Sequence, residues 1–425
     1  MKIDLPYGKG RIQAQVPDDR VSGVIHSRLD DWTSEFSEEE LIDRALLNPI
    51  GSPRLKDLAR DARNIVIICS DHTRPVPSKR IIPPMLREIR DGNPEADITL
   101  LIATGCHRET TKAELVEKFG EEIVSKEKIL VHDCLNGSFV SMGTLPSGGE
   151  LKINEIAANA DLLAAEGFIE PHFFAGYSGG RKSVLPGVAA AVSVWGNHCS
   201  SLIADPNSRC GVLDGNPIHE DMAAAARMAG LKFIVNVVIN SEKEVIGAFA
   251  GDGRDAHLAG CRFLDELCRS EAPKADIVIT TNNGYPLDQN IYQAVKGMTT
   301  AEAVCRPGGI IIMAAECGDG IGGDEFYRTF KNHFTAGDVM KEILNTPQDK
   351  TVPDQWQSQI FARVLMDHPV IFVSSADEET VRDLHMIPAA RIEDALKKAD
   401  ELLGYRGNVL VIPEGISNIL RAEES

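Results

Sequence analysis

The sequence of 425 residues lacks long hydrophobic runs and has little positive charge for its length. No stretch reaches the roughly 18 consecutive apolar residues of a membrane-spanning helix, and the first residues lack the apolar core of a signal peptide. We therefore expect a cytoplasmic protein. Lys and Arg total 44 against 63 Asp and Glu, which gives a formal net charge of −19. Because this charge repels nucleic acids and anionic membranes, we expect neither as a partner.

The sequence also lacks the cysteine patterns of disulfide frameworks and zinc ribbons. It has nine cysteines, an odd number, and none of them forms a C-x-x-C pair. We expect reduced and mostly buried thiols. Hydrophobic residues make up 43% and charged residues 25%, which is ordinary for a folded protein and argues against a disordered chain.

Short apolar runs, rich in β-branched residues, alternate with amphipathic helical patterns. Such runs are typical of strands buried on both faces of a parallel sheet, and the alternation predicts an α/β fold. The predicted strands are 64–69, 98–103, 233–238, 277–280, 310–313, 370–373 and 409–412, and the predicted helices include 38–47, 111–124, 255–268 and 391–403. A polar segment at 270–274 predicts a boundary between two domains, 1–268 and 269–425.

Polar clusters follow the first two predicted strands, where ligands of α/β proteins commonly bind. The first cluster, residues 70–75, contains Arg74, whose guanidinium could grip a carboxylate or phosphate through two hydrogen bonds. The second, residues 103–108, places His107 beyond a strand end. A surface turn and a structural histidine are the alternatives at these two positions.

The segment 170–187 is rich in glycine and contains both His172 and Lys182. Its glycines would allow a ligand to approach the backbone closely. The segment nearly matches a P-loop, but Arg181 replaces the second glycine and Pro186 interrupts the helix that should follow. A phosphotransferase that uses Lys182 is therefore an alternative that this segment alone leaves open.

Three further segments contain candidate groups. His198 joins the two earlier histidines as a possible ligand or base, although their spacing assigns no metal. In 282–296, Asp288 is a plausible helix N-cap, and the side chains of Gln289, Tyr292, Gln293 and Lys296 would then share one helical face. The motif G-x-G-x-x-G at 318–323 is predicted to form a tight turn or a ligand-facing acidic loop, because its aspartates would repel a pyrophosphate.

In combination, these motifs resemble the nickel-dependent lactate racemase family. The resemblance extends from about residue 60 to at least 360 and is carried by Asp71-His-Thr-Arg-Pro75, Thr104-Gly-Cys-His107, Pro171-His172, Gly176-Tyr-Ser-Gly-Gly-Arg-Lys182 and Tyr292-Gln-Ala-Val-Lys296. It implies two α/β domains with mostly parallel sheets and an active site in the cleft between them. It also implies a nickel-pincer nucleotide, in which a pyridinium-3-thioamide-5-thiocarboxylic acid mononucleotide holds Ni²⁺.

The resemblance also implies a role for each matching residue. Lys182 would carry the cofactor covalently, His198 would bind nickel, and His107 and His172 would act as acid and base. Asp71, Ser178, Gly179 and Gly180 would contact the cofactor, and Arg74, Lys296, Gln293, Tyr292 and Trp356 would contact the substrate. Arg181 departs from some family members, which carry a smaller residue there.

The implied activity is inversion of C2 in a small, lactate-like 2-hydroxycarboxylic acid. The α-proton of such an acid is very weakly acidic, so hydride transfer through a planar 2-oxo acid avoids a carbanion. Two histidines with pKa values near neutrality suit the hydroxyl groups of the two enantiomers. The expected partners are this substrate and the proteins that make the cofactor. A non-catalytic protein that binds small acids or metal is the other alternative, and the sequence leaves the substrate and the oligomeric state open.

Overall fold

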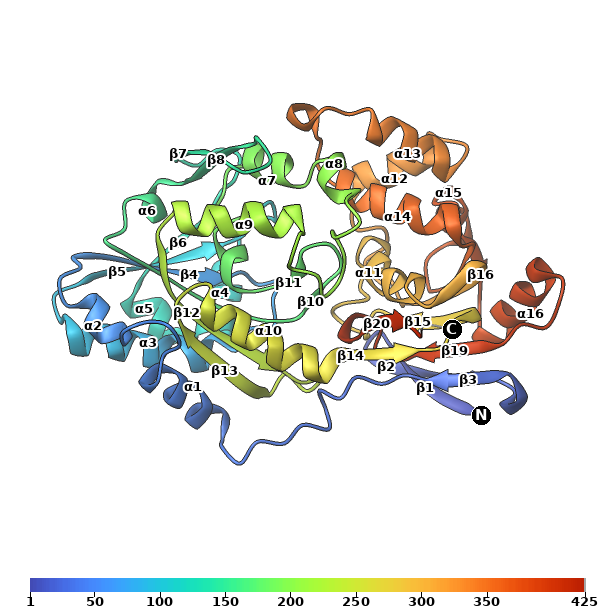
Figure 1. The fold of residues 1–425 in the computed structure, drawn as a ribbon, viewed down its shortest axis with the longest axis horizontal. Coiled ribbons are helices and arrows are strands. Elements are labelled where there is room, and N and C mark those ends of the chain that lie inside the picture. The colour runs from blue at the N-terminus through green and yellow to red at the C-terminus, as the bar shows by residue number, and fades with distance from the viewer. Residues whose placement is uncertain (424–425) are drawn as a thin grey trace. The chain divides into compact units, whose positions relative to one another are not determined.

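The computed structural model describes residues 1–423, which fold into two compact units (Figure 1). The larger unit contains Leu29–His198 and Asp205–Leu267, and the smaller unit contains Met1–Arg28, Cys199–Ala204 and the chain from Cys268 onward. The predicted domain 1–268 is one continuous segment, whereas Met1–Arg28 and Cys199–Ala204 belong to the smaller unit of the structure. Within residues 1–423, no helix combines the length and the apolar character needed to cross a bilayer.

The larger unit is built on a six-stranded sheet of order β13-β12-β9-β4-β5-β6, in which only β13 is antiparallel to its neighbour. The strands of this sheet are β4 (Asn64–Ser70), β5 (Asp97–Ala103), β6 (Lys128–Val131), β9 (Leu162–Phe168), β12 (Leu231–Ile239) and β13 (Val245–Gly251). The five residues of β4 from Ile65 to Cys69 are all buried, which confirms the predicted parallel strands with two covered faces.

Helices and two small hairpins surround this sheet. The helices are α1 (Glu38–Leu47), α2 (Leu55–Ala59), α3 (Ser78–Gly92), α4 (Lys112–Phe119), α5 (Glu121–Lys126), α6 (Glu155–Ala158), α7 (Ala191–Asn197), α9 (Pro217–Met228), α10 (Asp255–Cys268) and the 3-10 turn η2 (Gly180–Ser183). The hairpins are β7 (Phe139–Thr144) with β8 (Glu150–Asn154), and β10 (Pro171–His172) with β11 (Gly176–Tyr177).

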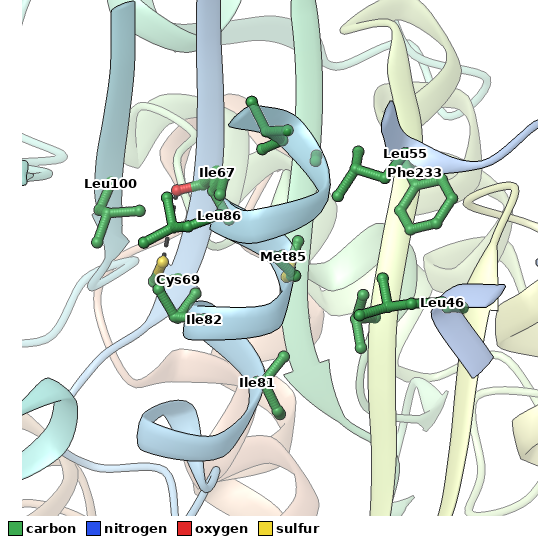
Figure 2. Close-up of a cluster of buried hydrophobic side chains, with 14 of the residues drawn as sticks. Leu46, Leu55, Ile67, Cys69, Ile81, Ile82, Met85, Leu86, Leu100 and Phe233 are labelled. Atoms are coloured by element: carbon green, nitrogen blue, oxygen red, sulfur yellow. Dashed lines mark hydrogen bonds between the residues drawn. The ribbon is translucent and has the colours of Figure 1, made fainter. Parts of the chain in front are cut away.

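Helix α3 packs against the sheet through one apolar face (Figure 2). Its residues Ile81, Ile82, Met85 and Leu86 lie beside Ile67 and Cys69 of β4 and Leu100 of β5, while Leu46, Leu55 and Phe233 extend the same cluster. Full burial of such a side chain contributes about 1.5–3 kcal/mol, so this cluster fixes the strand ends that carry the polar loops.

The smaller unit has its own six-stranded sheet, of order β18-β17-β16-β15-β19-β3, and all its strand pairs are parallel. The strands are β3 (Val21–Val24), β15 (Ala275–Thr281), β16 (Cys305–Ala314), β17 (Val370–Val373), β18 (Ile387–Ala389) and β19 (Val409–Ile412). Because β3 pairs with β19, the first residues of the chain belong to this unit. Domain boundaries that are predicted from the order of elements along the chain do not reveal such a pairing.

The other elements of the smaller unit are mostly helices. They are α8 (Ser200–Ile203), α11 (Ile291–Glu302), α12 (Asp324–Lys331), α13 (Ala336–Leu344), α14 (Gln355–Asp367), α15 (Glu378–Asp383), α16 (Ile392–Leu403), the 3-10 turns η1 (Asp18–Arg20), η3 (Gln348–Lys350) and η4 (Gly415–Ser417), and the strand pairs β1 (Lys2–Tyr7) with β2 (Gly10–Gln15) and β14 (Arg269–Ala272) with β20 (Ile419–Ala422).

Two local predictions are wrong for clear physical reasons. The predicted helix 111–124 is two helices, because Gly120 between α4 and α5 has a φ of +85°. The N-cap of α11 is Asn290, whose side chain accepts from Gln293 N, and not Asp288. The Asp288 carboxylate instead accepts hydrogen bonds from Gly8 N (2.7 Å) and Glu316 N (3.1 Å).

Candidate active site

The loop after β4 and the loop after β5 meet through a hydrogen bond between Asp71 and His107. His107 Nδ1 lies 2.7 Å from Asp71 Oδ2. Because an ionised carboxylate only accepts, Nδ1 carries the proton, and Nε2 is the atom that can exchange one with a ligand. The Asp71 side chain is 1% exposed and that of His107 is 43% exposed. Asp71 thus fixes the orientation of a histidine that solvent and ligands can reach.

A chain of hydrogen bonds connects this pair to Arg74. Arg74 Nη1 donates to Thr73 Oγ1 (2.9 Å), and Thr73 Oγ1 and N donate to Asp71 Oδ1 (2.7 and 3.1 Å). Burial would raise the pKa of Asp71, but the hydrogen bond and charge of His107, together with Arg74 and Thr73, outweigh it and lower this pKa to about 2. Asp71 is therefore a carboxylate throughout the physiological pH range.

This lowered pKa gives a testable dependence of stability on pH. The ordinary pKa of the group is 3.8, so its contribution to folding is fully present above about pH 4 and is lost as the pH falls toward 2. We expect Asp71→Asn to lower the free energy of unfolding by about 2 kcal/mol at pH 7 and much less near pH 2.5. Urea unfolding of both proteins at several pH values measures the difference. The control Asp349→Asn, at an exposed side chain, should show almost no difference at any pH.

A second group of polar side chains gathers around the ring of Phe174. His172 packs edge-on against this ring with the centroids 4.5 Å apart, and His198 does so at 5.1 Å. Lys182 Nζ lies 5.7 Å from the centroid of the same ring and 3.4 Å from His172 Nε2. The loop 170–187 and the end of α7 thus bring three predicted site residues around one aromatic side chain.

The protonation of the two histidines follows from their surroundings. His172 Nδ1 accepts from Ala175 N (3.2 Å), which leaves Nε2 as the ring nitrogen that faces Lys182. Burial, assisted by the charge of Lys182, lowers the pKa of His198 to about 3. His198 is therefore a neutral imidazole at physiological pH, which is the form that binds metals.

The glycine-rich loop that carries Lys182 is packed inside the fold. Ser178 Oγ donates to Phe168 O (3.0 Å) and accepts from Glu170 N (2.9 Å). Gly180 N donates to Asn236 Oδ1 (2.7 Å), and a Cβ on Gly179 would lie 2.7 Å from that oxygen. These contacts with the chain fix the shape of the loop, and contact of these groups with a cofactor stays a prediction.

Arg181 anchors the same loop from within the protein. Its guanidinium is buried and donates to Ala175 O (2.7 Å), and its Nη1 lies 2.9 Å from His257 Nε2 in α10. Burial lowers the pKa of Arg181 to about 10. The larger residue at this family position thus points into the protein, where it ties the loop to α10.

The close packing at Gly180 gives a second prediction. Gly180 has a φ of +52°, and a Cβ there would lie 2.6 Å from Cγ of the buried His257. We expect Gly180→Ala to lower the free energy of unfolding by about 2–4 kcal/mol, from backbone strain plus overpacking. The control Gly148→Ala has a φ of +92° with nothing within 4 Å, so it should cost only about 1 kcal/mol. Equal losses for the two variants, measured by urea unfolding, would contradict the packing argument.

A backbone hydrogen bond joins the two groups of the larger unit. Gly105 N, in the loop of His107, donates to Gly187 O (3.0 Å), at the end of the loop that carries Lys182. Both loops follow neighbouring parts of one sheet, β5 and β9, which flank β4. The structure therefore places His107, His172 and Lys182 in connected loops that follow strands of the sheet, and His198 at the end of α7.

The predicted substrate residues of the smaller unit lie on two helices that contact each other. Tyr292, Gln293 and Lys296 are half-buried on α11, between residues that are fully buried, so these three share a face, whereas Gln289 lies before the helix. Trp356 lies in the first turn of α14, and its neighbour Gln357 donates through Nε2 to Tyr292 O. Asp354, just before α14, accepts a hydrogen bond from the Tyr292 side chain.

Two sequence motifs have structural roles here. After Gly180 the chain forms the four-residue turn η2 and not the long helix of a P-loop. In the motif 318–323, Gly320 O and Ile321 O accept from Ile291 N and Tyr292 N, so this loop holds the start of α11. Across residues 1–423, no three His, Cys, Asp or Glu side chains form a group that could hold a metal ion. A metal at His198 would need its other donors from a bound molecule.

Sequence reasoning missed the residues that organise these groups. Phe174 was visible only as part of a Phe-Phe pair, and its central position depends on the fold of the hairpin β10–β11. Asn236 and His257 come from distant elements, and no pattern in the sequence connects them with the loop of Lys182.

Comparison with known proteins extends the match beyond these residues. Family models described as the N-terminal and C-terminal domains of lactate racemase match residues 7–211 and 270–420. Lactate racemases of Thermoanaerobacterium thermosaccharolyticum and Lactiplantibacillus plantarum are 53% and 50% identical over 421 residues, with 99% of each chain covered.

Solved structures agree with this match. The lactate racemase apoprotein of T. thermosaccharolyticum superposes with a TM-score of 0.96 at 52% identity, covering 99% of this chain and 100% of that one. A Thermotoga maritima protein, 19% identical over 92% of this chain and all of its own, shares the fold alone with a TM-score of 0.68. With both halves of the sequence matched in order and at this identity, the chain belongs to the lactate racemase family.

Proposed function

We propose that this protein racemises lactate, or a closely similar small 2-hydroxyacid, with the help of a bound nickel-pincer nucleotide. The observation that carries the proposal is the arrangement of His172, Lys182 and His198 around Phe174. The primary amine of Lys182 suits the covalent attachment of a cofactor. The neutral imidazole of His198, in the same small region, suits a metal ion that this cofactor holds. The names of the relatives support lactate as the substrate.

The residues present fit such a cofactor. The pKa of His198 is lowered to about 3, mainly by burial, so its neutral nitrogen suits Ni²⁺ as a ligand. Since residues 1–423 provide no cluster of three metal-binding side chains, the remaining donors would come from the cofactor itself. Lys182 would hold the cofactor covalently, and the proteins that synthesise it would be partners in loading. When bound, the cofactor supplies a hydride acceptor for C2 of the substrate.

The chain's own residues supply proton transfer at the substrate hydroxyl. Asp71 holds the proton of His107 on Nδ1, so Nε2 of His107 faces outward to take or return the hydroxyl proton. In His172, Nε2 is likewise the exchanging atom, because Nδ1 accepts from Ala175 N. Each histidine would take the hydroxyl proton of one enantiomer. The other histidine would then donate a proton to the oxygen when the product of opposite configuration forms.

The substrate carboxylate would be held by cations. Arg74 presents a guanidinium whose Nη1 is fixed by Thr73, and such a group binds a carboxylate through two hydrogen bonds. Lys296, with Gln293 and Tyr292 on the same face of α11, would contribute from the smaller unit, and Trp356 would border the substrate. A carboxylate held in place keeps C2 fixed while the hydroxyl group changes sides.

The test is stereochemical. Protein loaded with the nickel cofactor is incubated with single enantiomers of lactate, malate and a longer 2-hydroxyacid, and the products are separated by chiral chromatography. We expect inversion of lactate in both directions to an equal mixture, together with stoichiometric nickel in the protein. A loaded protein that inverts none of these acids would overturn the proposal.

A further inference from the structure

The loop between β4 and α3, residues 71–77, has no regular structure of its own, yet it carries both Asp71 and Arg74. Side chains from two other elements hold it. Glu166 of β9 is 1% exposed, and its Oε1 accepts from Ser70 N (2.8 Å), Ser70 Oγ (2.7 Å) and Ser78 Oγ (3.2 Å). One buried carboxylate oxygen therefore ties together the two ends of the loop.

The middle of the loop is held by Lys118 of α4. Lys118 Nζ donates to Arg74 O (3.1 Å) and to Val76 O (3.5 Å). Within residues 1–423, no carboxylate lies close enough to form an ion pair with this ammonium, although helix α4 is otherwise typical of a surface helix. Taking a charge out of water without an ion pair is unfavourable unless hydrogen bonds compensate, and here both hydrogen bonds go to the loop.

The electrostatic surroundings agree with this role. The pKa of Lys118 is lowered, mainly by burial and also by the charge of Arg74. The nearby groups that favour the charged ammonium are Glu166, Asp71 and the Cys69 thiol. The ammonium thus interacts electrostatically with Glu166, the carboxylate at the ends of the loop, and with Asp71, the carboxylate that orients His107. Its position suits a group that organises the loop more than one that stabilises the helix.

We propose that Lys118 is a positioning residue for the reaction, which fixes the backbone at Arg74 and Val76 so that Arg74 and the Asp71–His107 pair keep their arrangement. This inference rests on the proposed function, because it takes Arg74 as a ligand of the substrate carboxylate. Lys118 itself does not touch the substrate in this account. Its effect passes through two backbone carbonyl groups to the side chains of the loop.

The first measurement needs no cofactor and no activity. In hydrogen–deuterium exchange on the full chain, Lys118→Met should increase exchange in peptides covering 70–78 about tenfold or more, because both hydrogen bonds from the ammonium to the loop are lost. Lys118→Arg, which keeps a charged donor, should restore most of the protection. Lys112→Met, at an exposed lysine of the same helix, is the matched control and should leave exchange unchanged. If Lys118→Met fails to fold, Lys118→Gln is measured in its place.

The second measurement is a double-mutant comparison on the loaded enzyme. We expect Lys118→Met to raise KM for the 2-hydroxyacid about tenfold, and Arg74→Met to add little to KM in the Lys118→Met background. A purely structural role would leave the two effects additive. Unchanged exchange in 70–78 would overturn the role of Lys118. Increased exchange with an unchanged KM would support that role but overturn the assignment of Arg74, and so separates this inference from the proposed function.

Discussion

Lys182→Ala is expected to abolish racemisation and to leave a protein whose mass equals that of the polypeptide alone. In the proposed reaction a cofactor held by Lys182 accepts the hydride, and no natural side chain can replace it, so proton transfer by the histidines alone would not invert C2. We expect activity to fall by about a thousandfold or more. Intact-protein mass spectrometry after co-expression with the loading proteins, together with a lactate inversion assay, measures both effects.

The control for this variant is Lys232→Ala, at an exposed lysine of β12, which should keep both the added mass and the activity. Since Lys182 lies at the edge of the packed loop and contacts His172 and the Phe174 ring, the alanine variant should still fold. If Lys182→Ala retains a covalent adduct, the proposed attachment is wrong. If it loses the adduct but remains fully active, covalent attachment is not required.

His107→Asn is expected to reduce kcat/KM for both enantiomers by the same factor, about 10²–10⁴. In the proposed reaction, each direction of racemisation needs one histidine to take the hydroxyl proton and the other histidine to return one. Because the equilibrium constant between enantiomers is one, kcat/KM for the two directions must remain equal in any variant. His172→Asn should behave in the same way, so steady-state rates alone do not distinguish the two residues.

Single-turnover experiments distinguish them. With His107 replaced, His172 still accepts the hydroxyl proton of one enantiomer, so only that enantiomer should give a 2-oxo acid that can be trapped with a hydrazine. With His172 replaced, the other enantiomer should react. If both variants oxidise the same enantiomer, the assignment of one histidine to each face is wrong. Chiral chromatography and the yield of trapped product are sufficient for this comparison.

Much of the fold is predictable because β-branched runs form its strands. The runs beginning at Val370 and Val409 match β17 and β19 in full. The central strand β9 was missed, since its sequence Leu-Leu-Ala-Ala-Glu-Gly-Phe has no β-branched residue and contains a carboxylate. That carboxylate, Glu166, is buried because serine groups at the ends of the neighbouring loop surround it, a context that no local pattern reveals.

The candidate site is predictable to the extent that its residues follow strand ends or lie near one another in the sequence. His172 and Lys182 are ten residues apart in one compact loop, and Lys182 Nζ lies 3.4 Å from His172 Nε2. The pairing of Asp71 with His107 depends on β4 and β5 being neighbours, and the order of strands in the sheet is a tertiary property. For the same reason, the internal contacts of Ser178, Gly179 and Gly180 could not be read from their glycine-rich sequence.

The pairing of β3 with β19 has a consequence for how the chain reaches its native state during synthesis. The larger unit can close its core once the ribosome has released residues up to 267, whereas Val21–Val24 must wait for Val409–Ile412. During most of translation, β3 therefore remains without its partner, whereas β1 and β2 can pair with each other. A circular permutant that begins near residue 29 and carries residues 1–28 after the last strand would remove this delay, and it should give a larger soluble fraction than the natural order when both are made by cell-free translation.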